Sequence, residues 1–467
     1  MYQTVRNSAV KGDDMQLEIS GQSASEIAES LRRMLERGVL SPGDPLPSVR
    51  ALAETLSVNR NTVVAAYGEL TRSGLVVTRG RGGTHVADHA AVAQEGYAGD
   101  SVLRDVGTGN PDPARIPNAL HALGRLVERP VLYGTPVIDP GFEAWAHTWM
   151  SRDLAPAASM RLTITSGAAD AVERLLADVL TRGDGVALED PCFLASIHTV
   201  RLGGYRPVAV PVDEEGTTVA GLRTALEQGV RAVLCTPRAQ NPTGASLTAT
   251  RAAELRAVLS DFPYVLVIED DHFSMLSQVP LHSLIGPDHK RWAFIRSVSK
   301  FLGPDMCLAV AASDPDTAER LALRLTPGTT WVSHLLQRLT HAQMTDLDVL
   351  TGIADAGAHY RARNTAFAAL LTENGVPTTA GDGLNVWVPL PVATRAVTEQ
   401  LMRRGWLARS GEDFVLTRGD AGATGATGAL GHLRMTIHEL DDTDAARLAA
   451  DIADSVQAVQ AAQRKVQ

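Results

Sequence analysis

The chain has 467 residues, of which 45% are hydrophobic and 21% are charged, and its formal net charge at pH 7 is -10. This composition is typical of a globular protein that is long enough to form more than one domain. The acidic balance argues against a protein that binds nucleic acid over its whole surface, but it does not exclude a local basic site. The sequence has no stretch long and apolar enough to span a bilayer and no signal-peptide core, so we expect a cytoplasmic protein.

The N-terminal region is predicted to contain three short helices. The first spans residues 27–37, where apolar side chains recur at helical spacing until Gly38 stops the helix. A second helix opens at Pro47-Ser48, and a third spans residues 63–73 behind the capping segment 59–62. We expect the inward face of the third helix to consist of Val63, Ala66, Tyr67 and Leu70. A helix, a turn and a second capped helix form the geometry that puts a helix N-terminus into the major groove of DNA.

Residues 75–86 are predicted to form a wing, because two short β-prone runs flank a glycine-rich, basic tip. Between residues 48 and 86 there are five arginines and only two glutamates, a local charge balance of +3. The start of the third helix therefore offers candidates for contacts to base edges or phosphates, namely Arg60, Asn61 and Thr62. The remaining candidates for DNA binding are Ser48 and three arginines that we expect to contact phosphates, Arg50, Arg79 and Arg81.

The segment from about residue 23 to residue 87 resembles a GntR-type winged helix-turn-helix domain. The resemblance is carried by Leu46-Pro47-Ser48-Val49-Arg50, Leu52-Ala53, Asn61-Thr62-Val63, Ala66-Tyr67, Leu70 and Gly74. It implies a DNA-binding domain at residues 20–88 whose partner is a double-stranded DNA operator, and a winged helix that binds another protein is the alternative. Residues 89–104 begin with a run rich in Ala, Gly, Glu and Asp, and we interpret them as a linker.

From residue 105 to residue 467 strands and helices alternate along the chain. Strands are predicted at residues 161–164, 185–188, 207–210, 232–235, 265–268, 293–296 and 308–311. This alternation predicts an α/β fold with a doubly wound, mostly parallel sheet. A long helical stretch then leads into a small C-terminal α+β subdomain, at about residues 345–467, with strands predicted at residues 384–390 and 433–437.

Polar residues follow several of these strands in an order that suits a cofactor with a pyridine ring. Such a ring needs an amine for a Schiff base, an anion beside its ring nitrogen and donors for its phosphate. Lys300 is the candidate amine, and Asp270 at a strand end is the candidate anion. The candidate phosphate donors are the hydroxyl of Ser297 and the backbone at the start of a predicted helix, Ser166, Gly167, Ala168 and Ala169. Phe193 follows another strand and could stack on the ring face.

Residues from about 106 to 456 resemble a fold-type I aminotransferase. The matching motifs, in order, are Tyr133-Gly134, Ser166-Gly167-Ala168, Asn241-Pro242-Thr243-Gly244, Asp270, Ser297-Val298-Ser299-Lys300 and Arg434. The resemblance implies that Lys300 holds pyridoxal 5'-phosphate (PLP) as a Schiff base, the internal aldimine, and that Asp270 pairs with the ring nitrogen. It also implies that Asn241 bonds the ring hydroxyl and that Arg434 holds the carboxylate of a substrate or effector.

Two positions depart from that family. His272 stands where the closest members of the family have a tyrosine beside the ring hydroxyl, and Cys307 stands where they have an arginine that binds the phosphate. Without a bidentate guanidinium, phosphate binding must rely on backbone amides and on Ser297. The three cysteines, Cys192, Cys235 and Cys307, lack the spacing of metal ligands, so no metal site is expected.

The fusion of a GntR-type domain to an aminotransferase-like domain resembles the MocR subfamily of bacterial regulators. This resemblance implies a PLP-responsive transcriptional regulator, and a homodimer in which the partner chain completes each pocket. An active PLP-dependent aminotransferase (transaminase) with a DNA-binding domain is the alternative, although we favour a protein without enzymatic activity. A third interpretation is a scaffold that dimerises and never holds cofactor. The operator, the sign of regulation and the effector, whether PLP or an amino compound, stay open.

Overall fold

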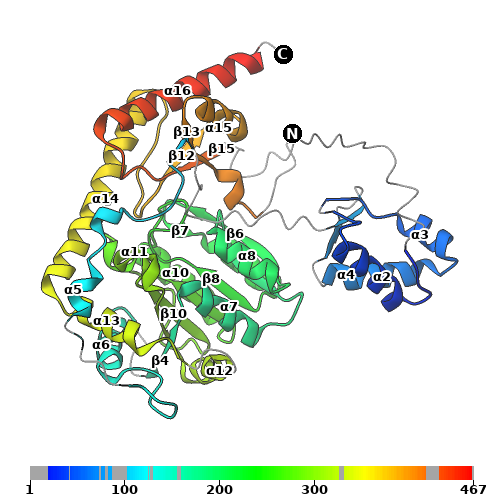
Figure 1. Cartoon of the computed structure of the whole chain (residues 1–467), viewed down its shortest axis with the longest axis horizontal. Coiled ribbons are helices and arrows are strands. Elements are labelled where there is room, and N and C mark those ends of the chain that lie inside the picture. The colour runs from blue at the N-terminus through cyan, green and yellow to red at the C-terminus, as the bar shows by residue number, and fades with distance from the viewer. Residues whose placement is uncertain are drawn as a thin grey trace. The chain divides into compact units, whose positions relative to one another are not determined.

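The computed structural model describes residues 19–41, 43–72, 75–78, 83–86, 102–124, 126, 130–154, 159–325, 331–416 and 431–464. These residues form two compact units, drawn in Figure 1. The smaller unit contains the described residues up to 86, and the larger unit contains nearly all of those from 102 onward. A search of the described helices finds none that combines the length and the apolar character needed to cross a membrane.

The smaller unit is built on three helices: α2 (Ala24–Glu36), α3 (Val49–Leu56) and α4 (Arg60–Arg72). A capping box starts α2, because the Ser23 side chain accepts the Glu26 N–H while the Glu26 carboxylate accepts the Ser23 N–H. The prediction from apolar spacing therefore began three residues too late. The same error occurs at α4, which begins at Arg60 because the Asn59 side chain accepts the Asn61 N–H at 2.9 Å.

The predicted inward face of α4 is confirmed. Val63, Ala66, Tyr67 and Leu70 are all buried in the core of the smaller unit, together with side chains of α2 and α3. The Tyr67 hydroxyl donates to the carbonyl of Pro47 at 2.7 Å, so α4 is tied to the residues that start α3. This bond fixes the angle at which the two helices meet, and with it the direction of the α4 N-terminus.

The wing is also confirmed as a two-stranded antiparallel sheet of β1 (Val76–Thr78) and β2 (Thr84–Val86). The chain before α3 lies along β2, because the Leu46 N–H donates to Thr84 and the Val86 N–H donates to Asp44. The basic tip, with Arg79 and Arg81, lies outside the described residues.

The larger unit contains an eight-stranded sheet. Its spatial order is β4 (Arg161–Thr165), β11 (Ala309–Ser313), β10 (Trp292–Ser297), β9 (Leu266–Asp270), β8 (Ala232–Cys235), β5 (Gly185–Asp190), β6 (Arg206–Asp213) and β7 (Gly216–Thr217). The pairs β10·β9, β9·β8, β8·β5 and β5·β6 are parallel. Strand β11 runs antiparallel to both neighbours, and β7 runs antiparallel to β6. The predicted mostly parallel sheet is therefore correct.

Both faces of this sheet are covered by helices, as Figure 1 shows. In β5, Val186 and Leu188 pack into one core while Ala187, between them, packs into the other. One face is covered by α7 (Ala168–Val179), α8 (Leu194–Leu202) and α12 (Pro315–Leu325). The opposite face is covered by α6 (Pro140–Ser151), α9 (Val219–Glu227), α10 (Ala249–Ser260), α13 (His334–Met344) and α14 (Leu347–Glu373). Two buried faces explain why these strands are continuous apolar runs in the sequence.

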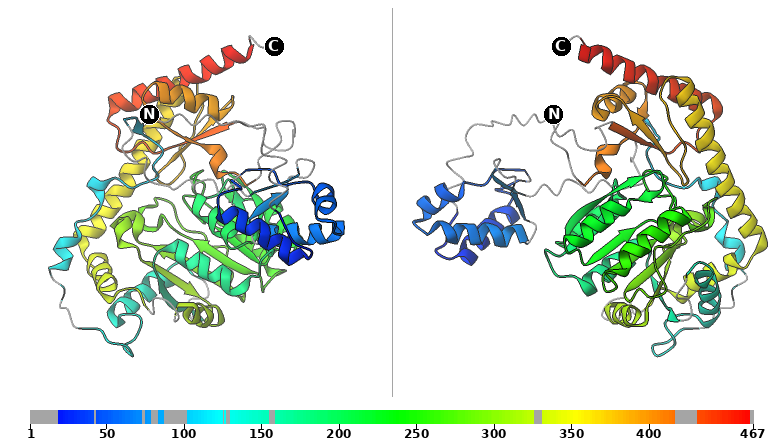
Figure 2. Two further views of the ribbon diagram at one scale, coloured as in Figure 1. Left: turned by 45° about the vertical axis from the view of Figure 1, so that its right-hand side comes forward. Right: turned by 180° about the vertical axis from the view of Figure 1, so that it is seen from behind.

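The C-terminal subdomain has a three-stranded antiparallel sheet in the order β12 (Val386–Leu390), β15 (Gly431–Met435) and β14 (Arg409–Ser410). Its core also includes residues of α15 (Thr394–Arg403) and α16 (Asp442–Arg464). Helix α14 runs alongside both sheets, which Figure 2 shows in two views. Arg104, the last residue of the expected linker, begins β3 (Arg104–Asp105), which pairs with β13 (Trp406–Leu407) in this subdomain.

Helix α14 packs closely against the segment that follows β9, and Gly357 offers a test of this packing. A Cβ at Gly357 would overlap the carbonyl oxygen of Leu276 in the short helix η4 (Ser274–Leu276). Alanine in a helix interior is normally favoured over glycine by about 1 kcal/mol. We nevertheless expect Gly357→Ala to lower the melting temperature, because the overlap forces the two helices apart.

The matched control is Gly352→Ala in the same helix, where an added Cβ meets nothing within 4 Å. This variant should keep or raise the melting temperature, which thermal unfolding followed by circular dichroism will measure. Equal stability of the two alanine variants would contradict the close packing at Gly357.

Candidate functional site

The pairing of three strands brings the predicted site segments to one edge of the larger sheet. Ala309 in β11 pairs with Ser297 at the end of β10 on one side and with Thr165 at the end of β4 on the other. Lys300 lies in the short helix α11 (Ser299–Leu302), which follows β10, and Asp270 is the last residue of the adjacent strand β9. Segments separated by more than a hundred residues therefore meet where ligands bind in open α/β sheets.

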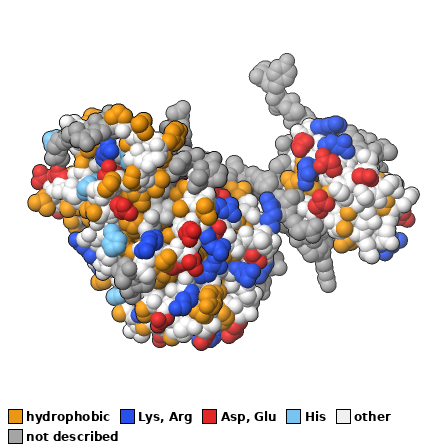
Figure 3. All heavy atoms as spheres, turned by 90° about the horizontal axis from the view of Figure 1, so that it is seen from below, with side chains coloured by type: hydrophobic (Ala, Val, Ile, Leu, Met, Phe, Trp, Pro, Cys, Tyr) orange, Lys and Arg blue, Asp and Glu red, His pale blue; other side chains and the backbone are white. Residues whose placement is uncertain are grey.

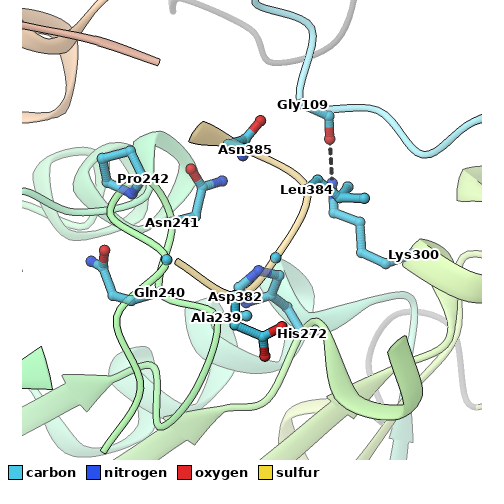
Figure 4. Close-up of a pocket in the computed structure, with 12 residues that line it drawn as sticks. Gly109, Ala239, Gln240, Asn241, Pro242, His272, Lys300, Asp382, Leu384 and Asn385 are labelled. Atoms are coloured by element: carbon cyan, nitrogen blue, oxygen red, sulfur yellow. Dashed lines mark hydrogen bonds between the residues drawn. The ribbon is translucent and has the colours of Figure 1, made fainter. Parts of the chain in front are cut away.

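A small pocket, part of it open to solvent, lies at this edge. Figure 4 shows Lys300 extending toward Gly109, whose carbonyl oxygen accepts a hydrogen bond from the Lys300 Nζ at 2.9 Å. Three residues predicted from the sequence, Lys300, Asn241 and His272, line the pocket. The other lining residues are Gly109, Ala239, Gln240, Pro242, Gly244, Asp382, Gly383, Leu384 and Asn385.

Arg434 lies beside the pocket and is fully buried. It donates to the carbonyl oxygen of Gly107 at 2.6 Å and to the Asn241 side-chain oxygen at 3.3 Å, and its guanidinium lies 4.8 Å from the ring centre of Phe414. Gly109 has a φ of +68°, and a Cβ there would lie 3.1 Å from an Arg434 nitrogen. A glycine at position 109 is therefore needed for the chain to pass between Arg434 and Lys300. Sequence reasoning missed Gly109, because a lone Gly-x-Gly is a weak signal.

Asp270 has a buried oxygen, Oδ1, that makes no hydrogen bond. Burial raises the pKa of Asp270 to about 7, the negative charges of Asp271 and Glu189 act in the same direction, and the charge of Lys300 opposes them. An acceptor that is buried without a donor is unfavourable. A protonated ring nitrogen is a donor that would satisfy it, so the residue fits the role expected from the sequence.

The neighbouring Asp271 has the opposite environment. Arg238 binds both of its carboxylate oxygens, at 2.8 and 2.9 Å, and Arg296 binds one of them at 2.8 Å. Burial alone would raise the pKa of Asp271, but Arg296 and Arg238 hold it below its usual range. Arg296 also donates to Asp153 at 2.6 Å. The sequence signal for this network is Arg296, an arginine inside an otherwise apolar strand.

The loop expected to bind a phosphate joins β4 to α7. Gly167 has a φ of +94° and precedes the first helical residue, so it turns the backbone into the helix. The Ser166 N–H is already engaged, because it donates to the Asp170 carboxylate at 3.0 Å. Cys307 lies beside this loop, as expected, and its thiol donates to the Ser166 carbonyl at 3.3 Å. The Ser297 hydroxyl donates to that of Ser299 at 3.1 Å.

The remaining predicted positions lie near these segments but are not brought into the pocket lining. Ala169 is in the first turn of α7, and Phe193 is half-buried directly before α8. Neither is among the described lining residues, and the same holds for Asp270, Ser297, Ser166, Gly167 and Ala168. A residue that we had not predicted, Gln240, does line the pocket and donates to the buried carboxylate of Glu189 at 3.2 Å. Only the fold could reveal this pair, since 51 positions separate the two residues.

The candidate DNA-binding residues lie at two helix starts in the smaller unit. Arg60 and Asn61 are exposed in the first turn of α4, and Thr62 is half-buried. Arg50 is exposed near the start of α3, where the Ser48 hydroxyl caps the helix by accepting the Ala51 N–H at 3.2 Å. On the larger unit, Figure 3 shows Lys and Arg side chains interspersed with Asp and Glu over the visible face.

Comparisons with known proteins agree with the division into a smaller winged helix-turn-helix unit and a larger α/β unit. Residues 23–86 match the family of bacterial regulatory proteins named gntR. The chain is 46% identical over 397 residues to the vitamin B6 salvage pathway transcriptional repressor PtsJ of Salmonella typhimurium, covering 85% of this chain and 92% of that relative. It is 29% identical over 322 residues to the HTH-type pyridoxine biosynthesis transcriptional regulator PdxR of Corynebacterium glutamicum, covering 64% of this chain and 68% of that relative.

The larger unit has the fold of aminotransferases. The structure of a kynurenine aminotransferase from Pyrococcus horikoshii superposes with a TM-score of 0.68 and 21% identity, covering 77% of this chain and 91% of that chain. This similarity identifies the fold alone, whereas both sequence relatives are named as transcriptional regulators. The expected fold class, a winged helix-turn-helix joined to an aminotransferase-like α/β unit, is therefore confirmed.

We expect Asp271→Asn to destabilise the larger unit strongly. It leaves the guanidinium groups of Arg238 and Arg296 without their shared anion, and breaking a buried ion pair in this way costs about 3–5 kcal/mol. Asp153→Asn is the control, because it removes a partly exposed carboxylate that also pairs with Arg296 and should cost about 1 kcal/mol or less. Urea unfolding will measure both, and equal losses would disprove the central role of Asp271.

The raised pKa of Asp270, about 7, predicts a pH dependence in protein without added cofactor. The folded state retains a proton that the unfolded state has released, so the stability from this group is present below the unfolded pKa of about 4 and is lost as the pH rises through 7. Asp270→Asn mimics the protonated acid. The variant should therefore gain stability over the wild type between pH 5 and pH 8. If the difference in melting temperature between the two proteins stays constant from pH 5 to pH 8, the raised pKa of Asp270 is refuted.

Proposed function

The chain belongs to the MocR subfamily of GntR-type transcriptional regulators, and from this premise we propose that it represses transcription in response to PLP. In this proposal α4 and the wing bind a double-stranded DNA operator, and the pocket at Lys300 holds PLP covalently. When bound, PLP supplies an aldehyde that reacts with amines and a ring that withdraws electrons.

The observation that carries the proposal is the buried, unpartnered Oδ1 of Asp270 next to the charge of Lys300. Asp270 would hold a proton on the ring nitrogen, and the Lys300 amine would form the covalent bond. Asn241 and His272 line the same pocket and would bond the ring hydroxyl. Arg434 would bind an α-carboxylate, since its guanidinium is next to Asn241.

A vitamin B6 compound is the effector that the relatives suggest. PtsJ is named for vitamin B6 salvage and PdxR for pyridoxine biosynthesis. An aminotransferase-like pocket that keeps a candidate amine and a candidate ring anion suits recognition of the same vitamin. Residual transaminase activity is the second candidate function, favoured by the grouping of Lys300, Asn241 and Arg434 around one pocket. Turnover assays with an amino donor and a keto acid will distinguish the two.

We further propose that the protein is a homodimer whose partner chain completes each pocket. Large apolar side chains are exposed on and around two adjacent helices, α5 (Ala119–Leu123) and α13. They are Leu120, Leu123, Leu132, Tyr133, Val137 and Leu335. Tyr133 is 90% exposed, and its ring centre lies 5.5 Å from that of Trp331. Several large apolar side chains exposed on neighbouring elements are a feature that subunit interfaces share.

Covalent binding of PLP at Lys300 is tested by Lys300→Ala. The variant should lose both the visible absorbance band of bound PLP and the adduct that borohydride fixes, because the reacting amine is gone. Lys290→Ala, which removes an exposed lysine on the same unit, is the control and should keep both. An adduct that peptide mapping finds at another lysine would refute the assignment. Operator binding by the smaller unit should survive in both variants.

The division of roles in DNA binding is tested at the two helix starts. Arg60→Ala and Asn61→Ala should each weaken binding to a selected operator by about 1–3 kcal/mol, with little effect on unrelated DNA. Arg50→Ala should weaken binding to both DNAs alike, because phosphates carry no sequence information. Fluorescence anisotropy with an operator selected from random sequence and with a scrambled copy measures the difference. Equal losses on both DNAs for all three variants would show that α4 does not read bases.

A further inference from the structure

The N-terminus of α7 already holds an anion from its own chain. One oxygen of Asp170 accepts the Ser166 N–H at 3.0 Å, and the other accepts from the Arg174 side chain at 2.6 Å. Arg174 is fixed in turn by a hydrogen bond of 2.9 Å to the carbonyl of Arg324. The carboxylate is therefore held at the helix end where backbone N–H groups and the helix dipole attract negative charge.

The thiol of Cys307 also contacts this loop. Cys307 donates to the Ser166 carbonyl at 3.3 Å, and a Cβ at Gly167 would lie 3.6 Å from its sulfur. Among the side-chain contacts that the structure gives for Ser166 and Gly167, none is to a lysine or arginine. The positive charge of Arg174, next to the loop, is paired with Asp170. A phosphate at this loop would meet a carboxylate before it met a cation.

We propose that the Asp170 carboxylate lowers the binding preference of the pocket for PLP over pyridoxal, which is the same aldehyde without its phosphate. This inference rests on the proposed function, because it assumes that PLP binds with its phosphate at Ser166–Ala169. The dianion must either displace the Asp170 carboxylate from the Ser166 N–H or bind beside it, and two negative charges at such short range repel each other. The phosphate therefore contributes less to affinity than it would at the same helix N-terminus without the Asp170 carboxylate.

Comparing the two aldehydes between wild type and variant isolates the contribution of the phosphate loop. Both carry the ring and the aldehyde, so the residues proposed to contact these groups, Lys300, Asp270 and Asn241, act on both. Free pyridoxal also closes to an internal hemiacetal, which PLP cannot form, so the effect of Asp170 is read from the change that a variant makes in the ratio of the dissociation constant of pyridoxal to that of PLP. A small ratio would let the regulator respond to the combined supply of the two aldehydes.

The test is titration of full-length protein with PLP and with pyridoxal, followed by the visible absorbance band. Asp170→Asn keeps an acceptor for the Ser166 N–H and removes the charge, so it should tighten PLP binding about tenfold or more, a change of about 1.4 kcal/mol. Pyridoxal binding should change by less than about twofold. Glu173→Gln, which removes an exposed charge from the same helix, is the control and should leave the ratio unchanged. Asp170→Ser, another small neutral residue, serves as a second variant if the asparagine protein does not fold.

The outcomes separate this inference from the proposed function. If wild-type protein binds PLP but Asp170→Asn leaves the ratio unchanged, or tightens both aldehydes equally, the role of Asp170 is overturned and the PLP site stands. If neither aldehyde binds wild-type protein, the proposed function fails, and this inference fails with it.

Discussion

The geometry of the pocket depends on the carboxylate of Asp271. It joins Arg238, which follows β8, to Arg296 near the end of β10, and it comes from the residue directly after β9. Three adjacent strand ends are thus fixed by one buried anion. Buried ions are costly unless they are fully paired, and the two guanidinium groups supply that pairing here. The arrangement holds the end of β9 in place, and with it Asp270, whose buried oxygen makes no hydrogen bond.

The pocket joins parts of the chain that belong to different layers. Asn241 and His272 come from loops at the edge of the larger sheet and Lys300 from the short helix α11, whereas Asn385 precedes β12 in the C-terminal subdomain. Arg434 in β15 bonds Asn241 directly, and Gly109 reaches the same place from the start of the larger unit. A ligand that touches Lys300 and Arg434 together must therefore bridge the sheet and the subdomain. Such a ligand can change how the two layers pack, which is what an effector of a regulator has to do.

The loop at α7 bears on how tightly the proposed cofactor would be held. The fold is that of aminotransferases, yet the loop at α7 presents Asp170 and Cys307. Fold similarity alone does not establish chemistry, because function resides in the site. An enzyme gains from holding its cofactor tightly. A sensor gains from releasing it when supply falls, since an occupied site that never empties reports nothing.

The sequence alone determined the order of elements, the winged helix and three of the residues that line the pocket, Lys300, Asn241 and His272. Apolar periodicity and turn residues are local signals, and they located the buried face of α4 and all seven predicted strands of the larger sheet. Helix starts were misplaced where a cap lay upstream of the first apolar residue, as at Ser23. Only the tertiary structure decided which polar groups meet, such as Asp271 with two arginines and Arg434 with Asn241. These contacts join residues far apart in the chain, and periodicity within a segment carries no information about partners outside it.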